Sequence, residues 1–175
     1  MRASGFAAIA GPNARVLILG TLPGMASLAA GQYYAHPRNA FWGIMGALVG
    51  AAPTLPYADR VRRLVANRIA LWDVCASAYR SGSLDAAIRS ESVRPNDIAR
   101  FLRHHRVRLI CFNGTNAARM FRRLVAPSLG PSSRSVNLLT MPSTSPAYAG
   151  MPFTEKLGAW RGALAERGGE TTGKR

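Results

Sequence analysis

Cysteine is scarce in this sequence. The chain has 175 residues and only two cysteines, Cys75 and Cys111, each inside a short apolar run. Two thiols cannot build a disulfide framework, a four-cysteine zinc site or an iron–sulfur cluster. We therefore expect no metal and no cofactor, and two buried free thiols of the kind found in a reducing cytosol.

Long apolar runs are also absent. No stretch approaches the ~18 apolar residues of a membrane-spanning helix, and residues 1–8 are too short and interrupted for a secretory signal. Apolar residues still make up 48% of the chain, which is enough for a core. We therefore expect a cytoplasmic protein with no membrane partner, built as a monomer with one domain over residues 1–167 and a frayed tail over residues 168–175.

Negative charge is rare. Eight acidic side chains face 23 basic ones, giving a net charge of +15, and 21 of the 23 basic residues are arginine. A GC-rich genome explains arginine in place of lysine, but it does not explain the shortage of carboxylates. A field of this sign favours a polyanionic partner, and the arginine fork suits phosphates, so nucleic acid is the first expectation and a nucleoid location in a bacterial-type cell the second.

Short apolar runs alternate with helical patterns along the chain. We expect strands at residues 16–19, 69–74, 107–112 and 136–141, and helices at residues 39–48, 57–67, 95–105, 115–125 and 153–167. Residues 21–38, 75–94 and 142–152 are expected as loops, with a possible short helix near residues 84–89. This alternation predicts an α/β fold, a single three-layer α/β/α domain around a central, mostly parallel four-stranded sheet.

Polar or glycine-rich residues follow each expected strand. These are residues 20–24, Asp73, Asn113 with Gly114, and residues 141–145. Ligands of parallel sheets bind beyond the carboxyl ends of the strands, so we expect these residues to meet at one edge. Asp73 could cap its own loop or accept a base N–H, while Asn113 could form a turn or present its amide to a base edge.

Two loop segments contain the residues that suggest a function. Residues 33–42, Tyr-Tyr-Ala-His-Pro-Arg-Asn-Ala-Phe-Trp, place aromatic rings beside an arginine, as recognition of an unstacked base requires. Each residue has a plainer alternative: Asn39 as a helix cap, and His36 in a hydrogen bond to the backbone. Residues 141–148, Met-Pro-Ser-Thr-Ser-Pro-Ala-Tyr, offer three hydroxyls for phosphates and Tyr148 for a base stack, or form only a polar turn.

Together these strings resemble the uracil-DNA glycosylase superfamily, and within it the hypoxanthine-DNA (deoxyinosine) glycosylase branch. The likeness runs from about residue 16 to residue 160. It rests on residues 17–24, Leu-Ile-Leu-Gly-Thr-Leu-Pro-Gly, on residues 33–42, on residues 70–74, Ala-Leu-Trp-Asp-Val, and on residues 141–148.

The resemblance implies a role for particular residues. Leu22 stands where other branches carry an aspartate or asparagine that handles water, and this task passes to Asn39, with Asn113 contributing. Tyr34 stands where relatives stack an aromatic ring on the extruded base. The remaining implied contacts are the base-binding residues Leu22, Gly24 and Asp73 and the DNA-binding residues Arg38, Ser143, Ser145 and Tyr148.

The implied activity is hydrolysis of the N-glycosidic bond of a flipped-out deaminated base in double-stranded DNA. The expected base is hypoxanthine, with xanthine as a second substrate, and the product is an abasic site. No lysine is expected near the motifs, since Lys156 and Lys174 are the only two, and this predicts a monofunctional enzyme. The alternatives are a mismatch-type uracil/thymine glycosylase, a non-catalytic DNA-binding relative, and an α/β protein that binds a free nucleoside or nucleotide.

Overall fold

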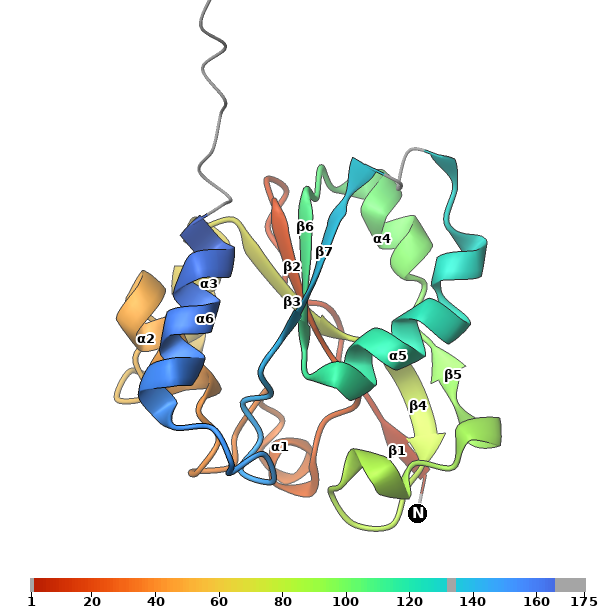
Figure 1. Ribbon diagram of the computed structural model, residues 1–175, viewed down its shortest axis with the longest axis horizontal. Helices are drawn as coiled ribbons and strands as arrows, with labels where there is room; N and C mark the ends of the chain where they lie inside the picture. The colour runs from red at the N-terminus through yellow and green to blue at the C-terminus, as the bar shows by residue number, and fades with distance from the viewer. Residues whose placement is uncertain (1, 132–134, 166–175) are drawn as a thin grey trace, which may run out of the picture.

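A parallel sheet forms the centre of the computed structural model, which describes residues 2–131 and 135–165 (Figure 1). Its strand order is β3-β2-β6-β7, and all three pairings are parallel. The strands are β2 (Val16–Gly20), β3 (Ile69–Asp73), β6 (Leu109–Asn113) and β7 (Asn137–Met141). The α/β class and the four expected strands are confirmed. The tail expected at residues 168–175 lies outside the described residues.

Both faces of the sheet are buried, which explains the continuous apolar runs of its strands. Successive residues of β2 alternate between two cores: Leu17 and Leu19 join one, while Val16 and Ile18 join the other. All five residues of β2 are buried. A strand covered on both sides has no polar face, and so the sequence shows a run rather than an alternation.

Helices cover each face in separate layers (Figure 1). One face packs against α2 (Phe41–Val49), α3 (Tyr57–Ala66) and α6 (Phe153–Ala165), and the opposite face packs against α4 (Ile98–His104) and α5 (Thr115–Leu124). The caps fit the sequence: Asp97 accepts a hydrogen bond from the Arg100 N–H at 2.9 Å and closes the first turn of α4. Among the described residues, no helix is long and apolar enough to cross a membrane.

A second, antiparallel sheet was not expected. Strand β4 (Cys75–Tyr79) pairs with β1 (Arg2–Ser4) and β5 (Arg94–Pro95), and the single-turn 3₁₀ helices η1 (Asp85–Ala87) and η2 (Ser90–Ser92) follow β4. The prediction of a loop over residues 75–94 is therefore wrong at β4. Small residues dominate this strand, so it lacks an apolar alternation, and its partner β1 lies more than 70 residues away in sequence.

A short helix also interrupts the loop expected at residues 21–38. Helix α1 (Met25–Ala30) spans six residues and ends at Gly31, whose φ of 62° closes the helix in the left-handed region. A helix of fewer than two turns shows no helical period in its sequence, and so α1 was not predicted. A third single-turn 3₁₀ helix, η3 (Ala126–Ser128), follows α5.

The strand register brings the functional loops together. Gly20 pairs with Asp73, and Asn113 pairs with Met141, so the four strands end at one edge of the sheet. The loops that leave these ends, with α1, gather below the sheet in the view of Figure 1. The expected convergence of the four polar clusters is thus a consequence of the parallel register.

Candidate functional site

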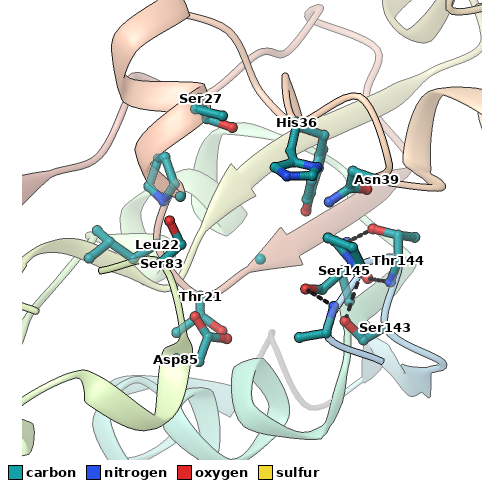
Figure 2. A pocket seen from close by; sticks show the side chains of 18 of the residues that line it. Thr21, Leu22, Ser27, His36, Asn39, Ser83, Asp85, Ser143, Thr144 and Ser145 are labelled. Atoms are coloured by element: carbon teal, nitrogen blue, oxygen red, sulfur yellow. Dashed lines mark hydrogen bonds between the residues drawn. The ribbon is translucent and has the colours of Figure 1, made fainter. Parts of the chain in front are cut away.

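A pocket of about 460 Å³ opens at this edge of the sheet, a size within the range of small-ligand sites. Its lining comes from every loop that leaves the carboxyl ends of the strands. Figure 2 shows Ser143, Thr144 and Ser145 on one side of the cavity and Leu22 and Asp85 on the other. The described lining residues are 20–27, 33, 34, 36, 39, 73, 83–85, 113 and 143–148.

Nine of the ten predicted site residues line this pocket. The one that does not is Arg38, which is exposed. The nine that do are Leu22, Gly24, Tyr34, Asn39, Asp73, Asn113, Ser143, Ser145 and Tyr148. The structure therefore places the residues of all four sequence strings around one cavity. It does not by itself assign their chemical roles.

Tyr34 is held in an unusual backbone conformation. Its φ of 54° is in the left-handed region, which is uncommon for a residue with a side chain and costs about 1–3 kcal/mol. The ring is stacked on Phe41, with ring centroids 4.1 Å apart, and the hydroxyl is buried. Burial, followed by the charge of Asp73, raises the pKa of Tyr34 far above its usual value, and a hydrogen bond with the Asn113 side chain acts in the opposite direction.

Asp73 lies on the floor of the pocket rather than at its rim. Its side chain is 3% exposed, and its Oδ2 atom has no hydrogen-bond partner among the described residues. Burial raises the pKa of Asp73 to about 8; the charge of Asp85 acts in the same direction, and that of Arg80 opposes both. The loop after β3 is held by the Asp73 backbone carbonyl, which accepts from Asn96 Nδ2 at 2.8 Å, and not by the carboxyl group.

Gly20 allows Asp73 and Tyr34 to approach each other. A β-carbon on Gly20 would lie 3.0 Å from the Tyr34 hydroxyl and closer still to Asp73 Oδ1. No other residue fits between these two groups without displacing one of them. The glycine at the end of β2 is therefore part of the architecture of the pocket floor.

Asn39 has one orientation. Its Oδ1 atom accepts a hydrogen bond from the Phe41 N–H at 3.0 Å, although the N-cap residue of α2 is Ala40 and not Asn39. This bond distinguishes the amide oxygen from the amide nitrogen. In Figure 2 the nitrogen lies on the side of the cavity, so Asn39 presents an N–H donor to the pocket.

Asn113 is bound at both ends of its amide. Its Nδ2 atom donates to Thr144 Oγ1 at 2.8 Å, and its Oδ1 atom accepts from the Thr144 N–H at 2.9 Å. Thr144 is 1% exposed, and its carbonyl also accepts from the Ala40 N–H at 3.0 Å. This arrangement ties the end of β6 to the 142–148 loop and to the start of α2. The Asn113 side chain also interacts with the Tyr34 hydroxyl.

The hydroxyls of Ser143 and Ser145 are oriented by the loop itself. Ser143 Oγ accepts from the Ser145 N–H, and Ser145 Oγ accepts from the Ala147 N–H, both at 3.2 Å. An oxygen that accepts from the backbone has its own hydrogen available to donate elsewhere. Both serines line the pocket, so these hydrogens are available to an anion at its mouth.

A buried lysine contacts this loop, which corrects the expectation that no lysine lies near the motifs. Lys156, in α6, is 5% exposed and donates from Nζ to the Tyr148 carbonyl at 2.7 Å. Its ammonium group also lies 5.1 Å from the centre of the Tyr148 ring. A helix beginning at Phe153 returns Lys156 to the loop, a proximity that sequence distance does not reveal. Lys156 does not line the pocket.

Two residues at this edge of the sheet, Arg80 and Asp85, were not expected from the sequence. Arg80 is 4% exposed and donates to the backbone carbonyls of Leu22 and Pro23, which fixes the loop after β2. Asp85 lines the pocket beside it. Both lie in the segment after the unexpected strand β4, so only recognition of that strand could have brought them to this edge.

His36 and Thr144 were within the quoted strings but received no role. His36 lines the pocket, and its Nδ1 atom accepts from the Arg38 N–H at 3.2 Å, which is the backbone bond offered as its plainer alternative. A nitrogen that accepts is unprotonated, so Nε2 is the atom that carries the hydrogen in the neutral ring.

No group of three histidine, cysteine, aspartate or glutamate side chains within the described part of the chain is arranged to hold a metal ion.

Comparison with known proteins agrees with this geometry. Residues 8–163 match the family model described as the uracil DNA glycosylase superfamily. The chain is 36% and 39% identical over 115 residues to proteins named hypoxanthine DNA glycosylase from Methanosarcina barkeri and Methanosarcina acetivorans, covering 65% of this chain and 72% of each relative.

A solved structure covers more of the chain. The solution NMR structure of a provisionally assigned uracil DNA glycosylase from Methanosarcina acetivorans superposes with a TM-score of 0.74 at 32% identity, over 94% of this chain and 99% of that one. The family match spans nearly all of the described residues and includes every strand of the parallel sheet. The chain belongs to the uracil DNA glycosylase superfamily, whose members are DNA glycosylases.

Proposed function

We propose that this protein removes hypoxanthine from double-stranded DNA by hydrolysis of the N-glycosidic bond, with xanthine as a second substrate. The observation that carries the proposal is the cavity shared by Tyr34, Asn39 and Asn113 at the carboxyl edge of the sheet. Its size suits one base, and its polar groups surround the space that the base would fill. The names of two relatives support the choice of base.

The base must leave the helix to reach this cavity. Extrusion of one nucleotide costs a few kcal/mol, and less for a weakly paired base such as hypoxanthine opposite thymine. The donor hydrogens of Ser143 and Ser145 at the pocket mouth suit the flanking phosphates. Tyr148, exposed at the rim, suits contact with the neighbouring stacked bases.

Bond cleavage is expected to lead and water attack to follow. Leu22 can neither orient nor deprotonate water, and the amide of Asn39 is no base, so a fully formed hydroxide nucleophile has no source in these residues. The C1′–N9 bond breaks first, its electron pair stays on the purine, and the sugar becomes an oxocarbenium ion. Water held by Asn39 then bonds to C1′ and releases a proton, and the departing base gains one. Positioning supplies much of the rate.

We also propose that the enzyme is monofunctional. A lyase step would need an amine that reaches C1′ as a nucleophile. Lys156 contacts the 142–148 loop from outside the pocket, and its Nζ atom is engaged with the Tyr148 carbonyl. The expected product is an intact strand with an abasic site, which breaks only after alkali.

Uracil is the second candidate substrate. It is favoured by the structural relative assigned as a uracil DNA glycosylase, which covers 94% of this chain. Uracil opposite guanine is also weakly paired, so flipping is inexpensive there too. Uracil is smaller than hypoxanthine and would leave part of a purine-sized cavity unfilled.

One cleavage assay separates these proposals. Labelled duplexes with a single inosine, xanthosine or uracil opposite each normal base are incubated with the protein and then heated in alkali. Breakage at inosine is expected, with weaker breakage at xanthosine. Breakage at uracil alone would replace the first proposal with the second, and binding without any breakage would identify a non-catalytic relative. Breakage before alkali would contradict the monofunctional proposal.

A further inference from the structure

One buried polar atom at the pocket floor lacks a hydrogen-bond partner among the described residues. It is the Oδ2 atom of Asp73, which is shielded from water. The other carboxyl oxygen, Oδ1, lies beside the Tyr34 hydroxyl, because both approach the space above Gly20. A buried polar group without a hydrogen bond costs about 1–3 kcal/mol, so this carboxyl group is expected to be satisfied by a ligand.

The surroundings of Asp73 decide its charge state. The titratable groups around it are Asp85, Arg80, Tyr33, Tyr34 and Cys75. Only Arg80 among them is cationic, and its guanidinium is directed to three backbone carbonyls, including those of Leu22 and Pro23. Asp85 adds a second negative charge. A carboxyl group that is buried, unpartnered and next to another carboxylate is held in its neutral form.

A neutral carboxyl differs from a carboxylate in what it can recognise. A carboxylate only accepts hydrogen bonds, whereas the neutral acid also donates one. Deamination converts adenine to hypoxanthine by replacing an amino donor with a keto acceptor. A donor on the pocket floor therefore matches the atom that distinguishes the damaged base from the intact one.

We infer that Asp73, as a neutral acid beside the Tyr34 hydroxyl, donates a hydrogen bond to the keto oxygen that a deaminated base carries in place of an amino group. This rests on the proposed glycosylase function and makes Asp73 a specificity-determining residue of the same site. The hydrogen bond strengthens as the C1′–N9 bond breaks, because negative charge spreads over the purine and its oxygen. The proton stays on Asp73, and the departing purine anion is protonated by water.

The pH dependence of the excision rate follows from this role. Burial, Asp85 and the opposing Arg80 leave the pKa of Asp73 at about 8, so the donor is present at neutral pH and is lost as the pH rises through that value. The single-turnover rate on an inosine duplex is therefore expected to fall about 10-fold for each pH unit above 8. Asp85→Asn removes a negative neighbour, so the decline should begin at lower pH.

Substitutions at Asp73 separate donation from other roles. Asp73→Asn keeps the shape and a neutral donor, and should retain the rate within about 10-fold while losing the decline between pH 7 and 10. Asp73→Ala should lose about 100-fold or more. Asp59→Asn, on α3 in an exposed pair with Arg62, is the matched control and should leave the profile unchanged.

A stability measurement tests the neutral acid without using activity. Asp73 titrates near 3.8 in the unfolded chain and near 8 in the folded one, so the folded state holds the extra proton between these values. Wild-type unfolding free energy should therefore fall relative to Asp73→Asn as the pH rises from 4 to 8. The difference between the two proteins should level off above pH 8.

The outcomes are distinguishable. A flat or rising wild-type rate through pH 8, or an inactive Asp73→Asn that still folds and binds the duplex, would overturn the inference and leave the glycosylase proposal standing. Excision of none of the three bases at any pH would defeat the glycosylase proposal. If, in addition, the difference in unfolding free energy between the wild type and Asp73→Asn did not change with pH, the neutral state of Asp73 would be refuted as well.

Discussion

At the scale of the residue, the amide of Asn39 is oriented by the chain rather than by a ligand. Its oxygen is occupied by the Phe41 N–H, so its nitrogen is the atom offered to the cavity. An N–H donor holds water by the lone pair of the water oxygen and leaves the water protons free. Water bound in this way suits attack on a sugar that is already cationic, where little deprotonation is needed in advance.

Asn39→Asp tests the role of the amide nitrogen as a hydrogen-bond donor. The aspartate keeps an oxygen for the Phe41 N–H and replaces the donor with an acceptor. The single-turnover rate should fall at least ~10-fold while duplex affinity stays within about 3-fold. Asn39→Ala should lower the rate similarly and also destabilise the start of α2 by about 1 kcal/mol. Quench-flow and anisotropy measurements check both, and full activity in both variants would remove Asn39 from the mechanism.

The residues of the site were predictable where polar side chains follow the end of a buried strand. Asp73 was singled out because it ends a buried strand, and Tyr34 and Asn39 because aromatic and amide side chains in a loop have few structural duties. The roles expected for Tyr34 and Asn39 came from the family resemblance. Arg80 and Asp85 were not identified, because they follow a strand whose partners are remote in sequence. The neutral state of Asp73 was likewise hidden, since it depends on burial and on Asp85 rather than on neighbours along the chain.

At the scale of the element, one residue at the end of β6 ties the 142–148 loop to the sheet. Asn113 binds both the backbone and the hydroxyl of Thr144, and Thr144 in turn accepts from Ala40. Hydrogen bonds therefore join the end of β6, the pocket loop and the start of α2. Gly114, with a φ of 100°, allows this contact, because a β-carbon there would lie 3.1 Å from Ser143 Cβ.

Thr144→Val tests this anchor. Valine keeps the shape and removes the hydroxyl, which leaves the Asn113 amide nitrogen without its partner. The unfolding free energy should fall by about 1–3 kcal/mol, measured by urea denaturation. Thr140→Val is the control, because Thr140 is exposed on β7 and a valine suits a strand there. Equal stability of the two variants would contradict the anchoring role.

Ser143→Ala tests the contact of the same loop with phosphates. Loss of one hydroxyl donor should weaken binding to any duplex, damaged or not, by about 2- to 10-fold. Ser90→Ala, in the exposed turn η2 away from the pocket, is the matched control. Anisotropy titrations with inosine-containing and undamaged duplexes would check it, and a loss confined to the inosine duplex would argue for a base contact instead.

The elements themselves were predictable in proportion to their length and burial. The strands of the parallel sheet were recognisable as apolar runs, and α3 and α5 were recognisable as amphipathic helices of ten residues each. Helix α1 is too short to show a period, and β4 is built from small residues that carry no pattern. Both missed elements depend on tertiary contacts, which a local pattern does not encode.

At the scale of the whole molecule, the net positive charge favours a polyanionic partner such as DNA. The net charge of +15 arises mainly from arginine, and the arginine side chains of α3, α4 and α5 are largely exposed. Phosphate contacts release condensed counterions, so their number determines how strongly binding depends on salt. In the proposed function the pocket selects the base, and we expect the surface field to supply most of the affinity.

Duplex affinity should accordingly fall steeply with salt. With about five phosphates neutralised, the dissociation constant should rise about 100-fold or more between 50 and 200 mM salt. Anisotropy over this range measures the slope on undamaged and inosine duplexes, which should be parallel because base contacts release few ions. A change smaller than about 3-fold would contradict an electrostatic DNA surface.

The central claim is that one everted purine occupies the cavity at the edge of the sheet. A crystal structure with duplex DNA carrying 2′-fluoro-arabinosyl hypoxanthine tests it directly, because the fluorine disfavours the oxocarbenium ion and preserves the glycosidic bond. The base is expected outside the helix, beside Tyr34 and Asn39, with its keto oxygen next to Asp73. A hypoxanthine still stacked in the duplex, or bound elsewhere on the protein, would contradict it.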